Sequence, residues 1–144
     1  MDAKDFNDKV KAFGQIVVPQ AVKLLHQKVS MEAAQRLIEK TPVDTGRARG
    51  NWQVAIGARP TGEVNVTDLL PKGDRPRTAL PSLAVSGQAA VDAALEKSQK
   101  IPGFCVSHVT NNVSYILKLE DGGSQQAPAG MMAVTFTELT EMFP

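Results

Sequence analysis

The sequence offers one pairing of a thiol with an imidazole that could support nucleophilic catalysis. Cys105 is the single cysteine of the chain, and His108, one of two histidines, follows it three residues later. A histidine that accepts the thiol proton would make the cysteine a nucleophile. The surrounding residues alternate between apolar and polar, however, which predicts a strand, and residues three apart on a strand point to opposite faces. We therefore assign no catalytic residue.

Metal-binding and acid–base sites have no stronger support. His26 falls inside a predicted helix among Lys and Leu residues, as an ordinary surface or boundary residue. No His-x-x-x-His or Glu-x-x-His spacing occurs, so a transition-metal site is not expected. Glu120 and Asp121 are adjacent at a predicted helix end, and the chain has neither a Gly-rich phosphate loop nor a Gly-x-Ser-x-Gly elbow. We expect no metal, no cofactor and no enzymatic activity.

The composition argues against nucleic-acid binding through net charge. Sixteen Lys and Arg residues balance fifteen Asp and Glu residues, and the formal charge of +1 is too small to hold DNA by the field of the whole protein. Trp52 could stack on a base, but it lies on the apolar face of a predicted strand, which favours its burial in the core. Six basic residues, interleaved with acids, are interpreted as a solvated strand face or a contact between subunits: Arg47, Arg49, Arg59, Lys72, Arg75 and Arg77.

The charge is uneven along the chain. Residues 1–50 carry nine basic side chains against six acidic ones, whereas residues 101–144 carry one against four. A positive end and a negative end suit head-to-tail contact between identical copies, which closes into a ring when the rotation allows. Chance variation over short segments explains the same numbers, and the sequence leaves both interpretations open.

The length and the apolar content predict one domain over residues 1–144. The chain is 42% apolar, and its single cysteine leaves no disulfide framework. Residues 1–6 hold no apolar run of the kind found in signal peptides, and no stretch approaches the ~18 apolar residues of a membrane span. We therefore expect synthesis in a cytoplasm and no membrane partner.

The spacing of apolar residues predicts a long N-terminal helix over residues 2–40. Asp2 can cap its start, and Pro42 pushes the preceding residue out of helical geometry and so ends it. Pro19 lacks the N–H that a helix interior uses, and we expect it to kink or divide the helix. A helix of this length needs packing for stability. Its first apolar stripe has spacings of four, three and four: Phe6, Val10, Phe13 and Val17.

The middle of the chain predicts a small antiparallel sheet. Apolar residues on one parity indicate a strand over residues 48–56, and a shorter partner strand is predicted around Val64 and Val66. Residues 68–82 contain three prolines and no clear period, so we expect a long extended loop. A further alternating segment predicts a strand over residues 104–109.

Shorter helices complete the predicted fold. Residues 83–100 read as an alanine-rich helix, opened by Ser82 or Ser86. A short helix that holds Tyr115 precedes a flexible loop over residues 122–130. The last helix carries a stripe of its own, Met132, Phe136, Leu139 and Phe143. We expect an α+β fold, a small antiparallel sheet packed against a long broken N-terminal helix and two shorter helices.

Two segments are more particular than ordinary turns. In the first, Pro42 stops a helix, Asp44 can accept a backbone N–H two residues on, and Gly46 can adopt a positive φ. This segment is Thr41, Pro42, Val43, Asp44, Thr45 and Gly46, followed by Trp52. In the second, a short helix leads into a loop of small residues that precedes the last helix. Its members are Tyr115, Glu120, Gly122, Gln126, Ala127, Pro128, Gly130 and Met131.

In this order, about seventy residues apart, the two segments resemble the tail-completion or neck family of long-tailed bacteriophages. These tail components are similar in role to the minor tail protein Z of phage lambda. The resemblance covers roughly residues 30–135. The chain departs from the family pattern at Ala48, where a larger apolar residue is usual. It also departs at Ile116 and Leu117, where a small residue often follows the tyrosine.

The resemblance implies a structural virion protein without catalysis. Such proteins form a ring at the head–tail interface, or neck, that completes the tail and joins it to the head connector, with genome DNA passing through the lumen. The implied partners are further copies of the chain, in a ring of six to match the tail, and neighbouring neck, connector, tail-tube or terminator proteins. After synthesis in the host bacterial cytoplasm, the implied location is the head–tail junction of the virion.

Other functions stay open at this point. A tail terminator or a head-closure protein has a similar size and fold class, and the sequence separates these poorly from a neck protein. A small hydrolase or a DNA-binding factor is the alternative from a different class.

Two loops are candidates for the contacts between subunits. Residues 68–82 and 122–130 are long and rich in Pro and Gly without periodicity, which suits loops that become ordered on docking. The candidate contact residues of the first loop are Lys72, Asp74, Arg75 and Arg77. The alternative is that both loops only close the domain.

Overall fold

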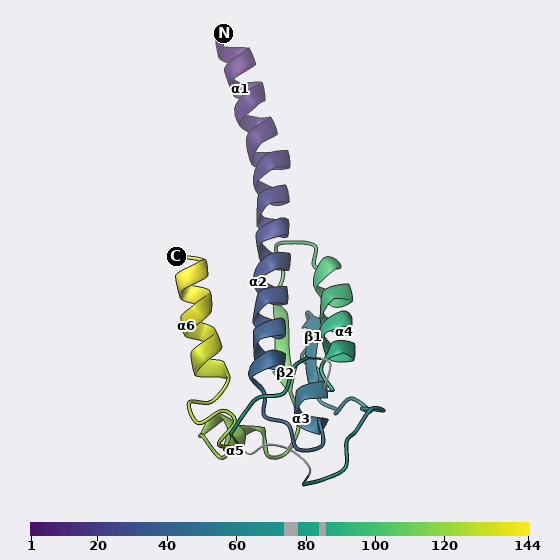
Figure 1. Cartoon of the computed structure of the whole chain (residues 1–144). Helices are drawn as coiled ribbons and strands as arrows, with labels where there is room; N and C mark the ends of the chain where they lie inside the picture. Colours follow the sequence, from purple (N-terminus) through teal and green to yellow (C-terminus); the bar gives the residue numbers. More distant parts are fainter. Residues whose placement is uncertain (74–77, 84–85) are drawn as a thin grey trace.

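The chain begins with a long helical run that projects well beyond the rest of the molecule (Figure 1). The computed structural model describes residues 1–73, 78–83 and 86–144. The run consists of α1 (Ala3–Ala12), the π-helix η1 (Phe13–Val17) and α2 (Val18–Lys40). The carboxylate of Asp2 caps it by accepting the N–H of Asp5 at 2.8 Å. The predicted helix over residues 2–40 is confirmed.

The expected break at Pro19 takes a different form. The run stays helical through the proline, and the irregularity is the π turn just before it, where the N–H of Val18 bonds to the carbonyl of Phe13. A proline ring clashes with the carbonyl four residues earlier in a regular α-helix, and a π turn widens the backbone at that point. The division of the helix at Pro19 is therefore corrected to a local widening at residues 13–17.

The sheet has two antiparallel strands, β1 (Trp52–Ile56) and β2 (Ser107–Asn111), paired from Trp52 opposite Asn111 to Ile56 opposite Ser107. The predicted strand over 48–56 begins too early, because α3 (Arg47–Gly50) forms one helical turn there.

The partner strand predicted at Val64 and Val66 is wrong, because β2 fills that place and these two residues lie in irregular structure. The N–H of Val64 bonds instead to the side-chain oxygen of the buried Asn51, at 2.6 Å. A side chain therefore replaces the strand partner that alternation predicted.

Three further helices follow, α4 (Gln88–Gln99), α5 (Ile116–Glu120) and α6 (Met132–Met142). The expected start of the alanine-rich helix near residue 83 is too early, and residues 84–85 lie outside the described part. Ser86 does not cap α4: its φ is +57° and its hydroxyl donates to the carbonyl of Asp68. The strand predicted over 104–109 is shifted to 107–111.

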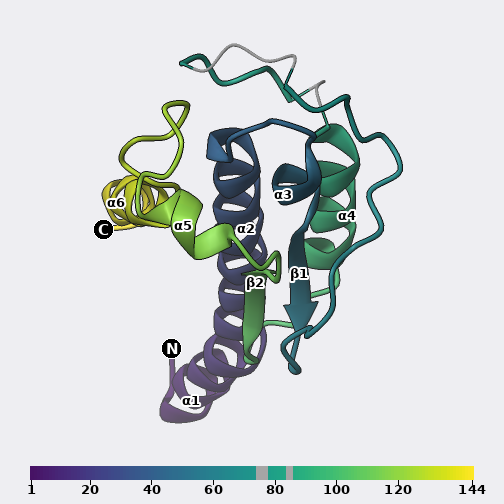
Figure 2. The ribbon, with the colours of Figure 1, turned by 90° about the horizontal axis from the view of Figure 1, so that it is seen from below.

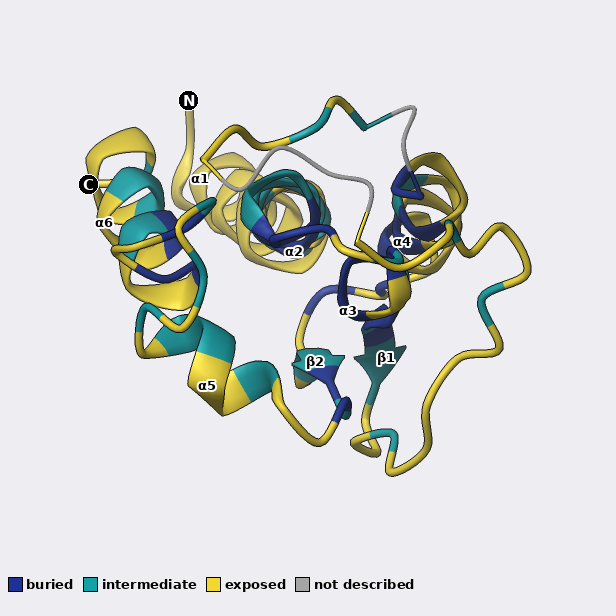
Figure 3. Ribbon diagram, turned by 60° about the horizontal axis from the view of Figure 1, so that its bottom comes forward, coloured by how far each residue is buried: buried dark blue, intermediate teal, exposed yellow. Residues whose placement is uncertain are grey.

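The helices and the sheet form an α+β fold, as expected. Seen from below, α2 and α4 lie beside the two strands, and α5 and α6 lie on the other side of α2 (Figure 2). The buried residues gather where α2, α4 and β1 meet (Figure 3). They form two clusters, one of Leu37, Ile38, Trp52, Ala90, Ala127 and Met131, and one of Ala34, Val54 and Ala94.

The first part of the helical run takes no share in this core. We call residues 3–25 the arm; α1 and η1 contain no buried residue. The apolar stripe predicted for this segment lies on the helix surface, and its side chains are at least half exposed: Phe6, Val10, Phe13 and Val17. None of the helices in the described residues combines the length and the apolar character needed to cross a bilayer.

Candidate functional site

The two motif segments meet at one corner of the molecule, which we call the motif corner (residues 41–49 and 115–131). Gln126 joins them: its side-chain oxygen accepts the N–H of Val43 at 2.8 Å, and its side-chain nitrogen donates to the carbonyl of Val43 at 2.9 Å. A glutamine amide thus pairs with one backbone residue as a neighbouring strand would. The ordered pair of sequence motifs therefore corresponds to a direct contact.

Glu120 holds the start of α6. Its carboxylate accepts the backbone N–H groups of Met131 at 2.7 Å, Met132 at 2.8 Å and Ala133 at 3.0 Å. These are donors that the first turn of a helix leaves without an internal partner. Burial by itself would raise the pKa of Glu120, but the three backbone hydrogen bonds outweigh it and the pKa lies below its ordinary value.

Two glycines of the second motif are required by this arrangement. Gly130 has φ +79°, and a Cβ there would meet the carbonyl oxygen of Glu120. Gly122 has φ +82°, and a Cβ there would lie 2.6 Å from the carbonyl oxygen of Pro128. Both positions combine a left-handed backbone with a close approach, which excludes other residues. The small-residue character of the motif therefore follows from packing.

Thr41 and Trp52 of the first motif are joined in the core. The indole N–H of Trp52 donates to the hydroxyl oxygen of Thr41 at 2.7 Å, and that hydroxyl donates to the carbonyl of Leu37. Trp52 is buried, as its position on the apolar face of the predicted strand indicated. The hydrogen-bond chain ties β1 to the last turn of α2.

Arg49 is the residue of this region that the sequence misplaced. We expected an outward arginine on a solvated strand face or a subunit contact, but Arg49 is fully buried. Its guanidinium donates to four backbone carbonyls, those of Glu39, Thr41, Pro81 and Ser82, at 2.8–3.3 Å. Burial lowers its pKa, and the nearby Glu39 opposes that effect. The side chain fastens both the end of α2 and the long loop.

Arg47 is one of the residues that line a recess in the motif corner. Its guanidinium pairs with Glu63 at 2.8 Å and lies 5.9 Å from the centre of the Tyr115 ring. Burial raises the pKa of Tyr115, although Arg47 opposes it. The recess, of about 190 Å³, is lined mainly by motif residues, among them Pro42, Asp44, Thr45, Leu119 and Ser124. Its groups suit recognition by hydrogen bonds and ion pairs.

The described parts of the loop over residues 68–82 lie against the motif corner. The N–H of Leu70 bonds to the carbonyl of Thr45, and the N–H of Gly73 bonds to the carboxylate of Asp44, both at 2.8 Å. Lys72, one of the candidate contact residues, lies between them and is exposed. The other three candidates, Asp74, Arg75 and Arg77, lie outside the described residues.

The second candidate loop, residues 122–130, is also attached to its own chain. Gln126 bonds to Val43, and Ala127 is buried in the core cluster. At Gln126 and Ala127 the loop is anchored to its own chain, which favours the alternative that it closes the domain. Its exposed residues, among them Pro128 and Ala129, stay accessible to a neighbour.

The histidines and the cysteine are not assembled into a reactive pair. The imidazole of His108 bonds to the carbonyl of Gly57 at 2.9 Å. His26 is half-buried and bridges α2 to the approach of β2, with one ring nitrogen 2.6 Å from the carbonyl of Gly103 and the other 2.8 Å from the hydroxyl of Ser107. Cys105 is a free thiol just before β2. Across the described residues, no group of three or more His, Cys, Asp or Glu side chains could hold a metal ion.

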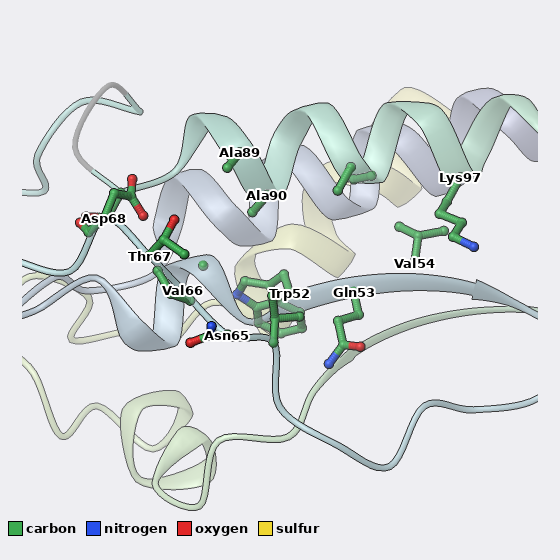
Figure 4. Close-up of a pocket in the computed structure, with 15 residues that line it drawn as sticks. Trp52, Gln53, Val54, Asn65, Val66, Thr67, Asp68, Ala89, Ala90 and Lys97 are labelled. Carbon is green, nitrogen blue, oxygen red and sulfur yellow. Dashed lines mark hydrogen bonds between the residues drawn. The ribbon is translucent and has the colours of Figure 1, made fainter.

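A second cavity lies between α4, β1 and the segment that crosses them (Figure 4). It has a volume of about 270 Å³ and a mostly apolar lining that includes Ala89 and Ala90 from α4, Trp52 from β1 and Val66 from the crossing segment. Lys97 stands at one end. The small alanine side chains of α4 leave this space open. We assign it no ligand.

Comparisons with protein-family models, with curated proteins and with solved structures found no match to this chain.

Proposed function

We propose that this chain is a structural subunit of a bacteriophage virion. In this proposal, copies of the chain form a ring, of six subunits by the symmetry of the tail, at the head–tail interface. The ring completes the tail and joins it to the head connector, and the genome passes through its lumen without base-specific contacts.

The observation that carries the proposal is the contact between the two motif segments. The resemblance rests on two short segments far apart in sequence, and chance similarity would not require them to touch. In the fold they meet through the paired hydrogen bonds of Gln126 and Val43, and Glu120 of the second segment organises the start of α6. The segments therefore act as one structural unit, which is what a family motif describes.

The arm gives independent support for an assembled state. Four large apolar side chains of its stripe are at least half exposed, from 50% at Val17 to 60% at Phe6. Large exposed apolar patches mark sites of interaction, among them protein–protein contacts. A subunit whose function is to contact its neighbours accounts for such a surface.

The test is electron microscopy of lysates from cells infected with a phage that lacks this gene, with the gene restored in trans as the control. We expect filled heads and free tails of normal length that do not join. Tails of uncontrolled length would favour a tail terminator instead, and heads that lose their DNA would favour a head-closure protein. Normal infectious virions without the chain would contradict all three.

A further inference from the structure

We propose that the arm of one copy docks on α6 of a second copy of this chain. The docking surface is the stripe of Phe6, Val10, Phe13 and Val17, and its partner is the exposed stripe of α6 around Phe136. This contact would join neighbouring subunits of the proposed ring. The inference rests on the proposed function in one respect, namely that copies of the chain associate.

Both stripes include large apolar side chains that are exposed on helices of the described residues. Phe6 is 60% exposed and Phe13 is 59% exposed on the arm, while Met132 is 51% exposed and Phe136 is 69% exposed on α6. The opposite side of α6 faces α2, where Thr135 is buried and Glu138 forms ion pairs with Arg36 and Lys40. Packing within the chain therefore uses one side of α6, leaves Met132 and Phe136 exposed, and half-buries Leu139 and Phe143.

The arm cannot cover α6 of its own chain. The arm and α2 form one helical run, and α6 packs beside the far half of that run (Figure 1). Folding back would require the helix to break at η1 or in α2, where the backbone hydrogen bonds continue. The occupant of each stripe must therefore come from another molecule.

The two stripes match in length and spacing. On the arm, the stripe runs from Phe6 to Val17 with steps of four, three and four residues. Met132, Phe136, Leu139 and Phe143 follow the same steps, with Phe143 directly after the end of α6. At ~1.5 Å per residue, each covers roughly 16 Å of helix. Equal apolar ridges of this kind interdigitate when two helices pack side by side.

Charge decides between α6 and a second arm as the occupant. The arm, residues 3–25, contains four lysines and two acidic residues, whereas α6 contains two acidic residues, Glu138 and Glu141, and no lysine or arginine. Glu138 already pairs with Arg36 and Lys40, which leaves Glu141 for a neighbour. Two arms packed together would bring together two surfaces of net positive charge, while an arm on α6 places its lysines near Glu141. Contact between different surfaces is also the type that closes a ring.

Cysteine cross-linking of the full chain tests the contact. In a C105S background, one protein carries Phe13→Cys and a second, distinguishable by a size tag, carries Phe136→Cys. A bismaleimide links two thiols that lie close together, and Leu117→Cys, at an exposed position of α5, is the matched control. We expect the mixed 13–136 product to exceed the 13–13, 136–136 and 13–117 products severalfold. Predominant 13–13 linking, or no mixed product, would overturn the inference.

Sedimentation measures the strength of the same contact. Phe13→Gln and Phe136→Gln should each weaken self-association on the order of tenfold or more, as for a central apolar contact residue, and Leu117→Gln should not. The double variant should be little weaker than either single variant, because both remove one contact. Losses that multiply, or a loss confined to one of the two sites, would contradict the pairing.

The outcome separates this inference from the proposed function. If 13–136 linking is found but heads and tails join without the chain, the proposed function fails and the contact stands. If the chain is needed for joining but its arms link only to arms, the contact fails and the function stands.

Discussion

One helical run joins the arm to the rest of the chain, which we call the body (residues 26–144). The two parts are stabilised by different means. In the last turns of α2, Ala34, Leu37 and Ile38 are buried against β1, α4 and α6, whereas in α1 and η1 no residue is buried. The same apolar periodicity runs through both parts. Periodicity therefore identifies a face that will be covered, but not whether the same chain or another chain covers it.

Among the substitutions that separate the two regions, we expect the largest loss of stability at Arg49, in the body. Arg49→Leu removes the donors for four backbone carbonyls in the interior, and we expect the free energy of unfolding to fall by about 3–5 kcal/mol. Arg49→Lys should recover only part of this, because an ammonium cannot reach four acceptors in the plane of a guanidinium. Urea unfolding measures both, with the exposed Arg59→Leu as the control.

Arg49 also marks the limit of what the sequence could predict. The long helix, the strand at Trp52, the late helices and the α+β class follow from local periodicity and were recovered. The helical turn at 47–50 was missed, because the left-handed Gly46 and the burial of Arg49 depend on the distant carbonyls of Pro81 and Ser82. A long-range bond of this kind leaves no periodic signal.

The sequence predicted which residues belong to the candidate site, but not which of them contact one another. The sequence named Glu120, Gln126 and Val43 as motif members, yet gave no reason for their pairing. The partner of β1 was mistaken for the same reason, since β2 lies about forty residues beyond Val64 and Val66, where alternation predicted the partner strand. Local pattern identifies the elements, and long-range hydrogen bonds decide which of them meet.

Glu120 should give the next largest effect in the body. Glu120→Gln removes the charge that accepts three N–H groups at the start of α6, and we expect a loss of about 2 kcal/mol at neutral pH. Because the folded-state pKa of Glu120 is lowered, its contribution is present above the ordinary value of ~4.3 and is lost as the pH falls through the lowered pKa. The variant should therefore be less sensitive to acid than the parent chain. Glu141→Gln, on the exposed part of α6, is the control, and an equal effect there would contradict the capping role.

Substitution of Gln126 should lower the stability less, and the loss should be confined to the motif corner. Gln126→Ala removes both hydrogen bonds to Val43, and we expect the stability to fall by about 1–2 kcal/mol. Gln126→Glu keeps an acceptor for the N–H but places a carboxylate against the carbonyl of Val43, so it should be at least as damaging above the pKa of that carboxylate. Hydrogen exchange of the Val43 amide measures the local opening directly. Unchanged protection in both variants would show that the two segments are held together by other contacts.

The arm should show the smallest effect on stability and the clearest contrast with the body. Phe6→Ser together with Phe13→Ser removes two exposed side chains that contact no core residue, and the unfolding free energy of the isolated chain should change by no more than about 0.5 kcal/mol. The same substitutions should shift the size distribution toward monomer, since the stripe is where we place the neighbouring α6. A matched body variant, Ile38→Ala, should do the reverse, costing about 2–5 kcal/mol through the cavity it leaves. If the arm variant instead unfolded the chain as Ile38→Ala does, the stripe would belong to the fold of the single subunit, and the division between arm and body would be wrong.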